Sequence, residues 1–196
     1  FHPGDLAYAT GYGSAWDRSM EQIEPISAYV PYMTAFGNHE RDFPNSGAAI
    51  GRGDSGGECG VPTQARFHMP TCPQPNTAPC VGHPAAAHSG LNLRPGHAQR
   101  RLSSPVGSAD DGWYSFDQGP VHFAVMNTEM SSRVGSRQHA FFAADLAAVD
   151  RSATPWVLFM GHRQMYCNRQ AASYDPKYDP TRPANDLGDI EPLLLQ

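Results

Sequence analysis

The chain has 196 residues, of which 40% are hydrophobic, and a formal net charge of -5. This length predicts one domain with one sizeable core. The negative charge gives no basic surface for a phosphate backbone, which excludes a dedicated nucleic-acid-binding protein, and no apolar run is long enough to cross a bilayer.

The first predicted helix covers residues 14–28. Its apolar residues recur at three- and four-residue steps: Trp16, Met20, Ile23 and Ile26. This period is typical of an amphipathic helix, with Ser14 available as the N-cap and Pro25 expected to end or bend the last turn. Residues 32–36 form a short apolar run closed by Gly37, which predicts a buried strand.

Residues 41–111 contain most of the 19 glycines and 18 prolines. We expect this part to be rich in loops, with a brief strand at 65–69 and an insertion at about 71–111. The four cysteines include no pair spaced for zinc. A local disulfide such as Cys72 with Cys80 is left open.

Regular structure is expected again from residue 113 onward. Residues 113–116 and 121–126 are strand-like runs around a Gly-Pro turn, which predicts a hairpin. Ser136 is placed to cap a helix, and residues 156–160 form an apolar strand before Gly161. The inner face of that helix carries Phe142, Leu146 and Val149. Alternating strands and helices predict an α/β layered fold with its site along one sheet edge.

Three short polar motifs follow these apolar runs, at residues 4–8, 37–40 and 161–163. Each begins with glycine, which lets the backbone turn sharply and direct the next side chain into a crevice. The side chains so placed are Asp5, Tyr8, Asn38, His39 and His162. Carboxylate, amide, phenol and imidazole groups are ligands for hard or borderline metal ions. Together the motifs predict a metal site.

The ordered series Gly-Asp-x-x-Tyr, Gly-Asn-His-Glu and Gly-His-Arg resembles the motifs of the purple acid phosphatases, which are calcineurin-like metallophosphoesterases. Residues 54–62, 113–123 and 154–157 are similar to the plant-type members. The resemblance implies an α/β fold, a layered αββα sandwich of the metallophosphoesterase type, incomplete at both ends. Residues 1–196 would then be a partial catalytic domain, and His2 would lie on the strand before Asp5.

The same resemblance implies roles for individual residues. Asp5 would bridge two metal ions, and Tyr8 would bind the ferric ion, Fe(III). Asn38 and His162 would bind a divalent ion: zinc, manganese or iron. His39 would act as the catalytic residue that stabilises the transition state or protonates the leaving group.

The implied activity is that of an acid phosphatase that hydrolyses phosphate monoesters by attack of a metal-bound hydroxide. Asn38, His39 and Arg163 would contact a small phosphorylated substrate. The resemblance also implies a secreted or vacuolar protein that forms a homodimer, with no nucleic-acid or membrane partner.

Two expected elements are missing from this sequence: an upstream Asp that binds the ferric ion and a downstream Gly-His-x-His motif. With four of the seven usual ligands, we expect these 196 residues alone to bind metal poorly and to be weakly active or inactive. Gln164 stands where plant members have proline. The alternatives are a metallophosphoesterase acting on diesters or nucleotide pyrophosphates, and a non-catalytic binding protein derived from the fold.

Two other short motifs do not indicate function. Residues 53–57 match the nucleophile loop of chymotrypsin-like proteases, but the order of His, Asp and Ser is wrong for that class. Residues 52–54 spell an integrin-type tripeptide of a kind that occurs often by chance. The histidines outside the metal motifs are expected to be structural or solvent-facing: His68, His83, His88, His97, His122 and His139.

Overall fold

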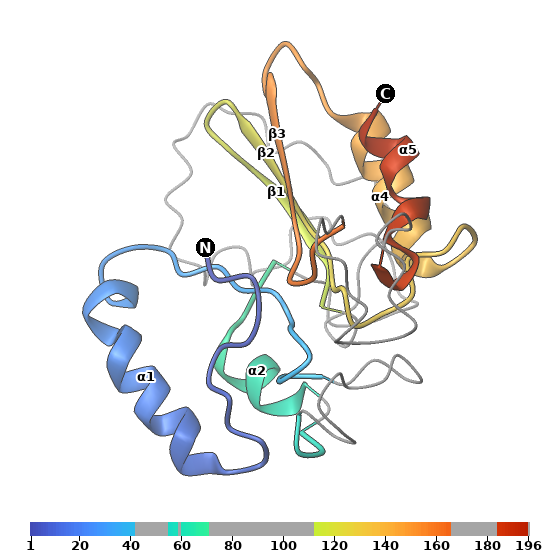
Figure 1. Cartoon of the computed structure of the whole chain (residues 1–196). Coiled ribbons are helices and arrows are strands. Elements are labelled where there is room, and N and C mark those ends of the chain that lie inside the picture. Colours follow the sequence, from blue (N-terminus) through green and yellow to red (C-terminus); the bar gives the residue numbers. More distant parts are fainter. Residues whose placement is uncertain (42–54, 59, 71–111, 166–183, 196) are drawn as a thin grey trace, which may run out of the picture.

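The computed structural model describes residues 1–41, 55–58, 60–70, 112–165 and 184–195 (Figure 1). Its elements, in chain order, are α1 (Gly13–Ser27), α2 (Val61–Arg66), β1 (Tyr114–Gln118), β2 (Val121–Val125), α4 (Arg137–Ala148), β3 (Trp156–Met160), the 3-10 helix η1 (Ala184–Asp189) and α5 (Glu191–Leu194). The predicted α/β class is confirmed. The whole predicted insertion at 71–111, including Cys72 and Cys80, lies outside the described residues.

The sheet has the strand order β1-β2-β3. β1 and β2 pair antiparallel across the turn at Gly119 and Pro120, which confirms the predicted hairpin. β2 and β3 pair parallel, and α4 lies in the connection between them. A parallel pair needs such a crossover because the chain must return to the same end of the sheet before the next strand starts.

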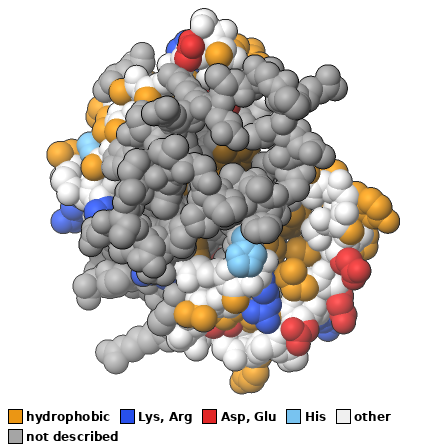
Figure 2. Space-filling view, turned by 180° about the vertical axis from the view of Figure 1, so that it is seen from behind, with side chains coloured by type: hydrophobic (Ala, Val, Ile, Leu, Met, Phe, Trp, Pro, Cys, Tyr) orange, Lys and Arg blue, Asp and Glu red, His pale blue; other side chains and the backbone are white. Residues whose placement is uncertain are grey.

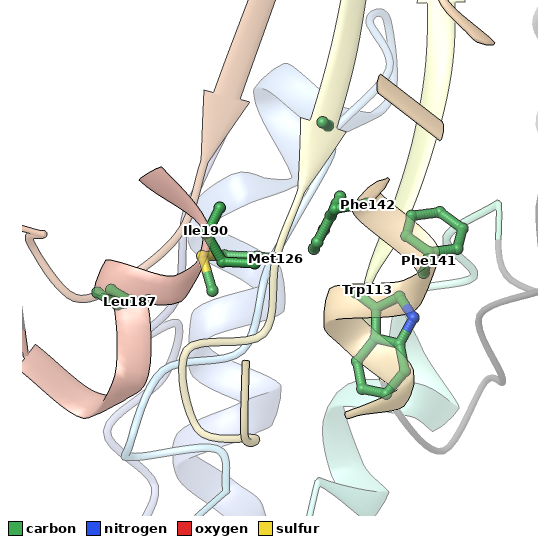
Figure 3. Packing of buried hydrophobic residues seen from close by; sticks show 7 residues of the cluster. Trp113, Met126, Phe141, Phe142, Leu187 and Ile190 are labelled. Atoms are coloured by element: carbon green, nitrogen blue, oxygen red, sulfur yellow. The ribbon is translucent and has the colours of Figure 1, made fainter. Parts of the chain in front are cut away.

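Helix α4 begins where the sequence predicts. The Ser136 side chain accepts a hydrogen bond from the His139 backbone N–H at 3.1 Å, which satisfies one of the free donors of the first turn. Its Phe142 is fully buried. Figure 3 shows one core built from three parts of the chain. Helix α4 contributes Phe141 and Phe142, the η1–α5 segment contributes Leu187 and Ile190, and Trp113 and Met126 lie next to β1 and β2.

The predicted strand at residues 32–36 is wrong in extent. Only Thr34 pairs, in an isolated parallel bridge with His2. Pairing stops there because Pro3 has no N–H and because Gly4, with φ +96°, donates its N–H to the His2 carbonyl instead of to a neighbouring strand. The segment is still held to the sheet, since the Tyr114 hydroxyl donates to the Thr34 carbonyl at 2.7 Å.

The strand predicted at residues 65–69 is also wrong, because α2 occupies residues up to Arg66. Gly60, with φ +81°, starts this helix, and Pro62 lies in its first turn, where a missing N–H costs nothing. Phe67 then ends the helix in an extended conformation. The helix-start residues Gly60 and Pro62 therefore outweighed the strand-like pattern at residues 65–69.

Helix α1 starts at Gly13, one residue before the predicted start, and its N-cap is Tyr12 rather than Ser14. The helix ends two residues after Pro25, as predicted. Trp16 is its buried residue, whereas Ile26 is 56% exposed, so the apolar period does not mark a fully buried face. Figure 2 shows the molecule from behind, with hydrophobic side chains standing among charged ones on the described surface.

β3 confirms the strand predicted at residues 156–160, but it is less buried than a continuous apolar run suggests. Trp156 is 67% exposed and Leu158 is 46% exposed. Among the described residues, β2 is its hydrogen-bonded neighbour and no strand pairs with its other edge. No described helix combines the length and apolar character that crossing a membrane requires.

His122 on β2 joins the hairpin to α4. Its Nδ1 lies 2.7 Å from Asp117 on β1, and its Nε2 lies 2.9 Å from Asp145 on α4. The Ser115 hydroxyl also donates to Asp145, at 2.6 Å. Burial lowers the pKa of His122, but hydrogen bonds and charge attraction from the two carboxylates outweigh burial, so the pKa lies above its ordinary value. His122 is therefore structural, as predicted.

We expect His122→Gln to destabilise the protein by about 2 kcal/mol below about pH 6, because the variant loses two charge-assisted hydrogen bonds. Since the folded-state pKa is raised, this stabilisation is complete below the unfolded-state pKa and is lost as the pH rises through the folded-state pKa. Urea unfolding of both proteins between about pH 5.5 and pH 9 measures the difference. The same substitution at the exposed His68 is the control, and a pH-independent difference for His122 would contradict the prediction.

Candidate functional site

Three segments that are distant in the sequence meet at the His162 side chain. His162 Nε2 lies 3.2 Å from Asp5 Oδ1 and 3.1 Å from Asn38 Oδ1. Asp5 lies in the loop after the His2 bridge, Asn38 in the turn after residues 34–36, and His162 just after β3. The structure thus brings together three of the four predicted metal ligands, each at the end of an apolar segment.

The hydrogen bond of the other ring nitrogen, Nδ1, orients the His162 imidazole. Nδ1 lies 3.1 Å from the Pro3 carbonyl oxygen, which can only accept, so Nδ1 carries the proton of this hydrogen bond. Nε2 then faces two oxygens that are themselves acceptors. Three side-chain groups that can each bind a metal ion therefore converge at this point.

The donor set fits a metal ion. Ligand atoms about 2.1 Å from one ion, in octahedral or tetrahedral coordination, lie about 3.0–3.4 Å from each other. The two distances from Nε2 fall within this range. An imidazole whose second nitrogen donates to a backbone carbonyl is also the usual arrangement of a metal-bound histidine.

Tyr8, the fourth predicted ligand, is 59% exposed beside Asp5. A hydrogen bond to the Asp5 side chain is the main cause that raises the pKa of Tyr8. Asp5 and Tyr8 have φ of 56° and 49°, a left-handed conformation that residues with a side chain rarely adopt. Such strain is often found at functional sites.

His39 lies next to these groups. Its backbone N–H donates to Asp5 Oδ1 at 3.2 Å, and its ring centroid lies 4.3 Å from that of Tyr8. Its Nδ1 is buried and has no hydrogen-bond partner among the described residues. The predicted catalytic role of His39 stays a prediction.

Gly4 and Gly37 allow this close approach of the loops. A Cβ on Gly4 would lie 2.6 Å from the Gly37 nitrogen and 2.9 Å from His162 Cγ. A Cβ on Gly37 would collide with Asp5 Oδ1 and would lie 3.0 Å from His162 Cδ2. The two glycines in the motifs are therefore required for packing between the loops as well as for the turns.

Glu40 is the residue whose role the sequence did not indicate, although it belongs to the Gly-Asn-His-Glu motif. Its fully buried carboxylate accepts backbone hydrogen bonds from Asp5 at 2.7 Å, Leu6 at 2.7 Å and Gly37 at 2.9 Å. Burial raises the pKa of Glu40, and the three hydrogen bonds oppose part of that shift. Glu40 therefore ties the loop that carries Asp5 to the loop that carries Asn38.

Arg163, the predicted substrate-binding residue, contacts a different partner. Its Nε and Nη2 donate to the two carboxylate oxygens of the fully buried Glu129, each at 2.7 Å. Contact with a substrate stays a prediction for this residue. Of the residues predicted for the site, Asp5, Tyr8, Asn38, His39 and His162 lie together.

Comparison with known proteins finds plant relatives. The chain is 41% identical over 163 residues to a protein of Arabidopsis thaliana named Probable inactive purple acid phosphatase 27, and this alignment covers 83% of the chain and 21% of that protein. It is 37% identical over 163 residues to the Nucleotide pyrophosphatase/phosphodiesterase of Hordeum vulgare, which covers 83% of the chain and 35% of that protein. No family model matches.

Among solved structures, a purple acid phosphatase isolated from yellow lupin (Lupinus luteus) seeds is similar, with a TM-score of 0.63 and 36% sequence identity. The match covers 97% of this chain and 27% of the lupin chain. The chain thus spans about a fifth to a third of the length of the plant proteins that it matches.

We expect Glu40→Ala to destabilise the protein by about 3 kcal/mol or more, because three backbone N–H groups lose their acceptor and each buried loss costs about 1–3 kcal/mol. Glu40→Gln should lie between Glu40→Ala and the wild type, since its amide retains one oxygen. Urea unfolding checks both variants, with Glu21→Gln on the exposed surface of α1 as a control that should change stability by less than about 0.5 kcal/mol. A Glu40→Ala protein as stable as the control would refute the role of Glu40.

Proposed function

This chain belongs to the purple acid phosphatase family, and we propose from this membership and from the site geometry that it hydrolyses phosphate monoesters. The observation that supports the proposal most directly is the convergence of Asp5, Asn38 and His162 on one point. The substrate would be a small phosphorylated molecule. The protein would act as a secreted or vacuolar enzyme and form a homodimer.

Four residues would hold the metal ions. Asp5 would bridge a ferric ion and a divalent ion of zinc, manganese or iron, with Tyr8 on the ferric ion and Asn38 and His162 on the divalent ion. The pair would supply positive charge to the phosphoryl oxygens and would lower the pKa of bound water. The observed contacts of Asp5 with Tyr8 and with His162 support one shared position for this set.

The side chains themselves would orient the reaction. The Pro3 carbonyl, 3.1 Å from Nδ1, would hold His162 in the tautomer whose Nε2 lone pair points toward Asp5 and Asn38. The Tyr8 ring and the Asp5 carboxylate hold His39 from two sides. From this place His39 would stabilise the charge on the phosphoryl group or give a proton to the leaving oxygen.

Two alternatives have specific support. The barley relative is named a nucleotide pyrophosphatase/phosphodiesterase, which favours diesters or pyrophosphates as a second substrate class. The Arabidopsis relatives are named probable inactive, which favours a binding role with little hydrolysis. The three readings differ in which substrate is turned over, so rates on a monoester, a diester and a nucleotide pyrophosphate distinguish them.

We expect Asp5→Asn in the full-length protein to lower kcat on p-nitrophenyl phosphate by about 100-fold or more, because a neutral amide cannot bridge two cations. A tyrosine bound to Fe(III) would give a visible charge-transfer band, so Tyr8→Phe should remove that band from the iron-loaded protein while iron content stays near that of the wild type. Metal analysis, absorption spectra and rates on the three substrate classes measure these effects. An unchanged spectrum in Tyr8→Phe would remove Tyr8 from the proposed ligands.

A further inference from the structure

Glu129 is a carboxylate with no exposed surface. An unpaired charge in this position would be strongly unfavourable. The groups that donate hydrogen bonds to the Glu129 carboxylate therefore indicate its structural role. Arg163 provides two parallel hydrogen bonds of 2.7 Å, and the Thr128 hydroxyl provides a third at 3.0 Å. A paired Arg–carboxylate contact of this kind fixes orientation as well as distance.

The loop that carries Glu129 is itself anchored. Gln138 on α4 accepts from the Asn127 backbone N–H at 2.8 Å and donates to the carbonyls of Asn127 and Met130 at 3.0 and 3.2 Å. The Asn127 side chain accepts from the Glu129 backbone N–H at 2.9 Å. Glu129 therefore stands on a loop that is pinned to a helix by buried polar contacts.

The segment that carries His162 is held to the same loop. The Arg163 backbone N–H donates to Thr128 Oγ1 at 3.3 Å, and the Met126 N–H donates to the Met160 carbonyl at 2.8 Å. A Cβ on Gly161 would lie 2.7 Å from Met126 Cγ, so the two segments are in close contact. β3 ends at Met160, and residues 161–165, which lie in no helix or strand, are held by these contacts and by the packing of Met165 against the core.

We propose that the Glu129–Arg163 pair is a positioning device that holds His162 against Asp5 and Asn38, and that Arg163 acts through this pair rather than by direct contact with substrate. Arg163 is the next residue after His162, so fixing its backbone and its guanidinium fixes where the imidazole stands. The proposal rests on the metal site proposed above.

A substrate phosphate that contacted Arg163 without displacing Glu129 would have to use the guanidinium hydrogens outside the paired contact. Both guanidinium nitrogens that form the paired contact, Nε and Nη2, already meet a carboxylate from which water is excluded. Its charge is therefore matched before any substrate arrives. The two roles differ in an observable way, because only positioning makes Glu129 as important as Arg163.

The test measures Zn²⁺ affinity by isothermal titration calorimetry in the full-length protein, with KM and kcat measured alongside. Glu129→Gln and Arg163→Gln should each weaken Zn²⁺ binding by about 10- to 100-fold, the usual effect of losing a group that supports a ligand. The double variant should lose much less than the product of the two effects, because both changes break one contact. Arg163→Lys should recover only part of the affinity, since lysine keeps the charge but not the paired geometry.

Asp145→Asn is the matched control, because it removes another buried carboxylate whose partners, Ser115 and His122, are not among the site residues. It should lower thermal stability and leave Zn²⁺ affinity unchanged. Equal weakening in this control would overturn the proposal, since general destabilisation would then explain the result. If Glu129→Gln does not fold, the double change Glu129→Leu and Arg163→Met keeps the buried volume without the charges, and Zn²⁺ binding as tight as in the wild type would also overturn it.

Two other outcomes separate this proposal from the function on which it rests. A higher KM in Arg163→Gln, with Zn²⁺ affinity unchanged and Glu129→Gln silent, would overturn only the positioning role. Zn²⁺ affinity that is unchanged by Asp5→Asn would reject the proposed metal site, and the positioning role with it.

Discussion

The meeting of His162 with Asp5 and Asn38 is the contact on which the rest of the site depends. It joins residues up to 157 positions apart, and it places a carboxylate oxygen and an amide oxygen 3.2 Å and 3.1 Å from one imidazole nitrogen. The three groups come from separate loops, so the surrounding chain must hold those loops together. Gly4 and Gly37 remove the side chains that would prevent the approach, and Glu40 binds the two loops through their backbone N–H groups.

The requirement to hold these loops in place also explains the buried polar groups around the site. Glu40 and Glu129 are both fully buried carboxylates, yet they are satisfied differently: Glu40 by three backbone N–H groups and Glu129 by an arginine and a hydroxyl. Glu40 connects the loop of Asp5 with the turn at Gly37, and Glu129 connects its own loop with the segment of Arg163. Buried polar contacts of this kind are directional, whereas apolar attraction is not, so the polar contacts define the positions of the loops more narrowly.

Family membership and structure agree on the fold. The likeness to the lupin purple acid phosphatase, at 36% identity and a TM-score of 0.63, confirms the layered metallophosphoesterase fold that the motifs predicted. The relatives differ in what their names state, from purple acid phosphatase to nucleotide pyrophosphatase/phosphodiesterase to probable inactive purple acid phosphatase. The fold therefore carries more than one activity, and the substrate of this chain depends on the groups that line its own site.

The sequence by itself determined several of the local elements and predicted the residues of the candidate site. The hairpin, the Ser136 cap and β3 follow from period, turn chemistry and capping, which act within a few residues. The motifs that begin at Gly4, Gly37 and Gly161 predicted which residues would lie together.

Only the tertiary structure decided which loops support these residues. The strand predicted at 32–36 shrank to one bridge because Gly4 turns the neighbouring chain away, and Arg163 was paired with Glu129, which no spacing in the sequence indicated. Hydrogen bonds between loops depend on distances across the folded chain. Residue periodicity reports only contacts along it.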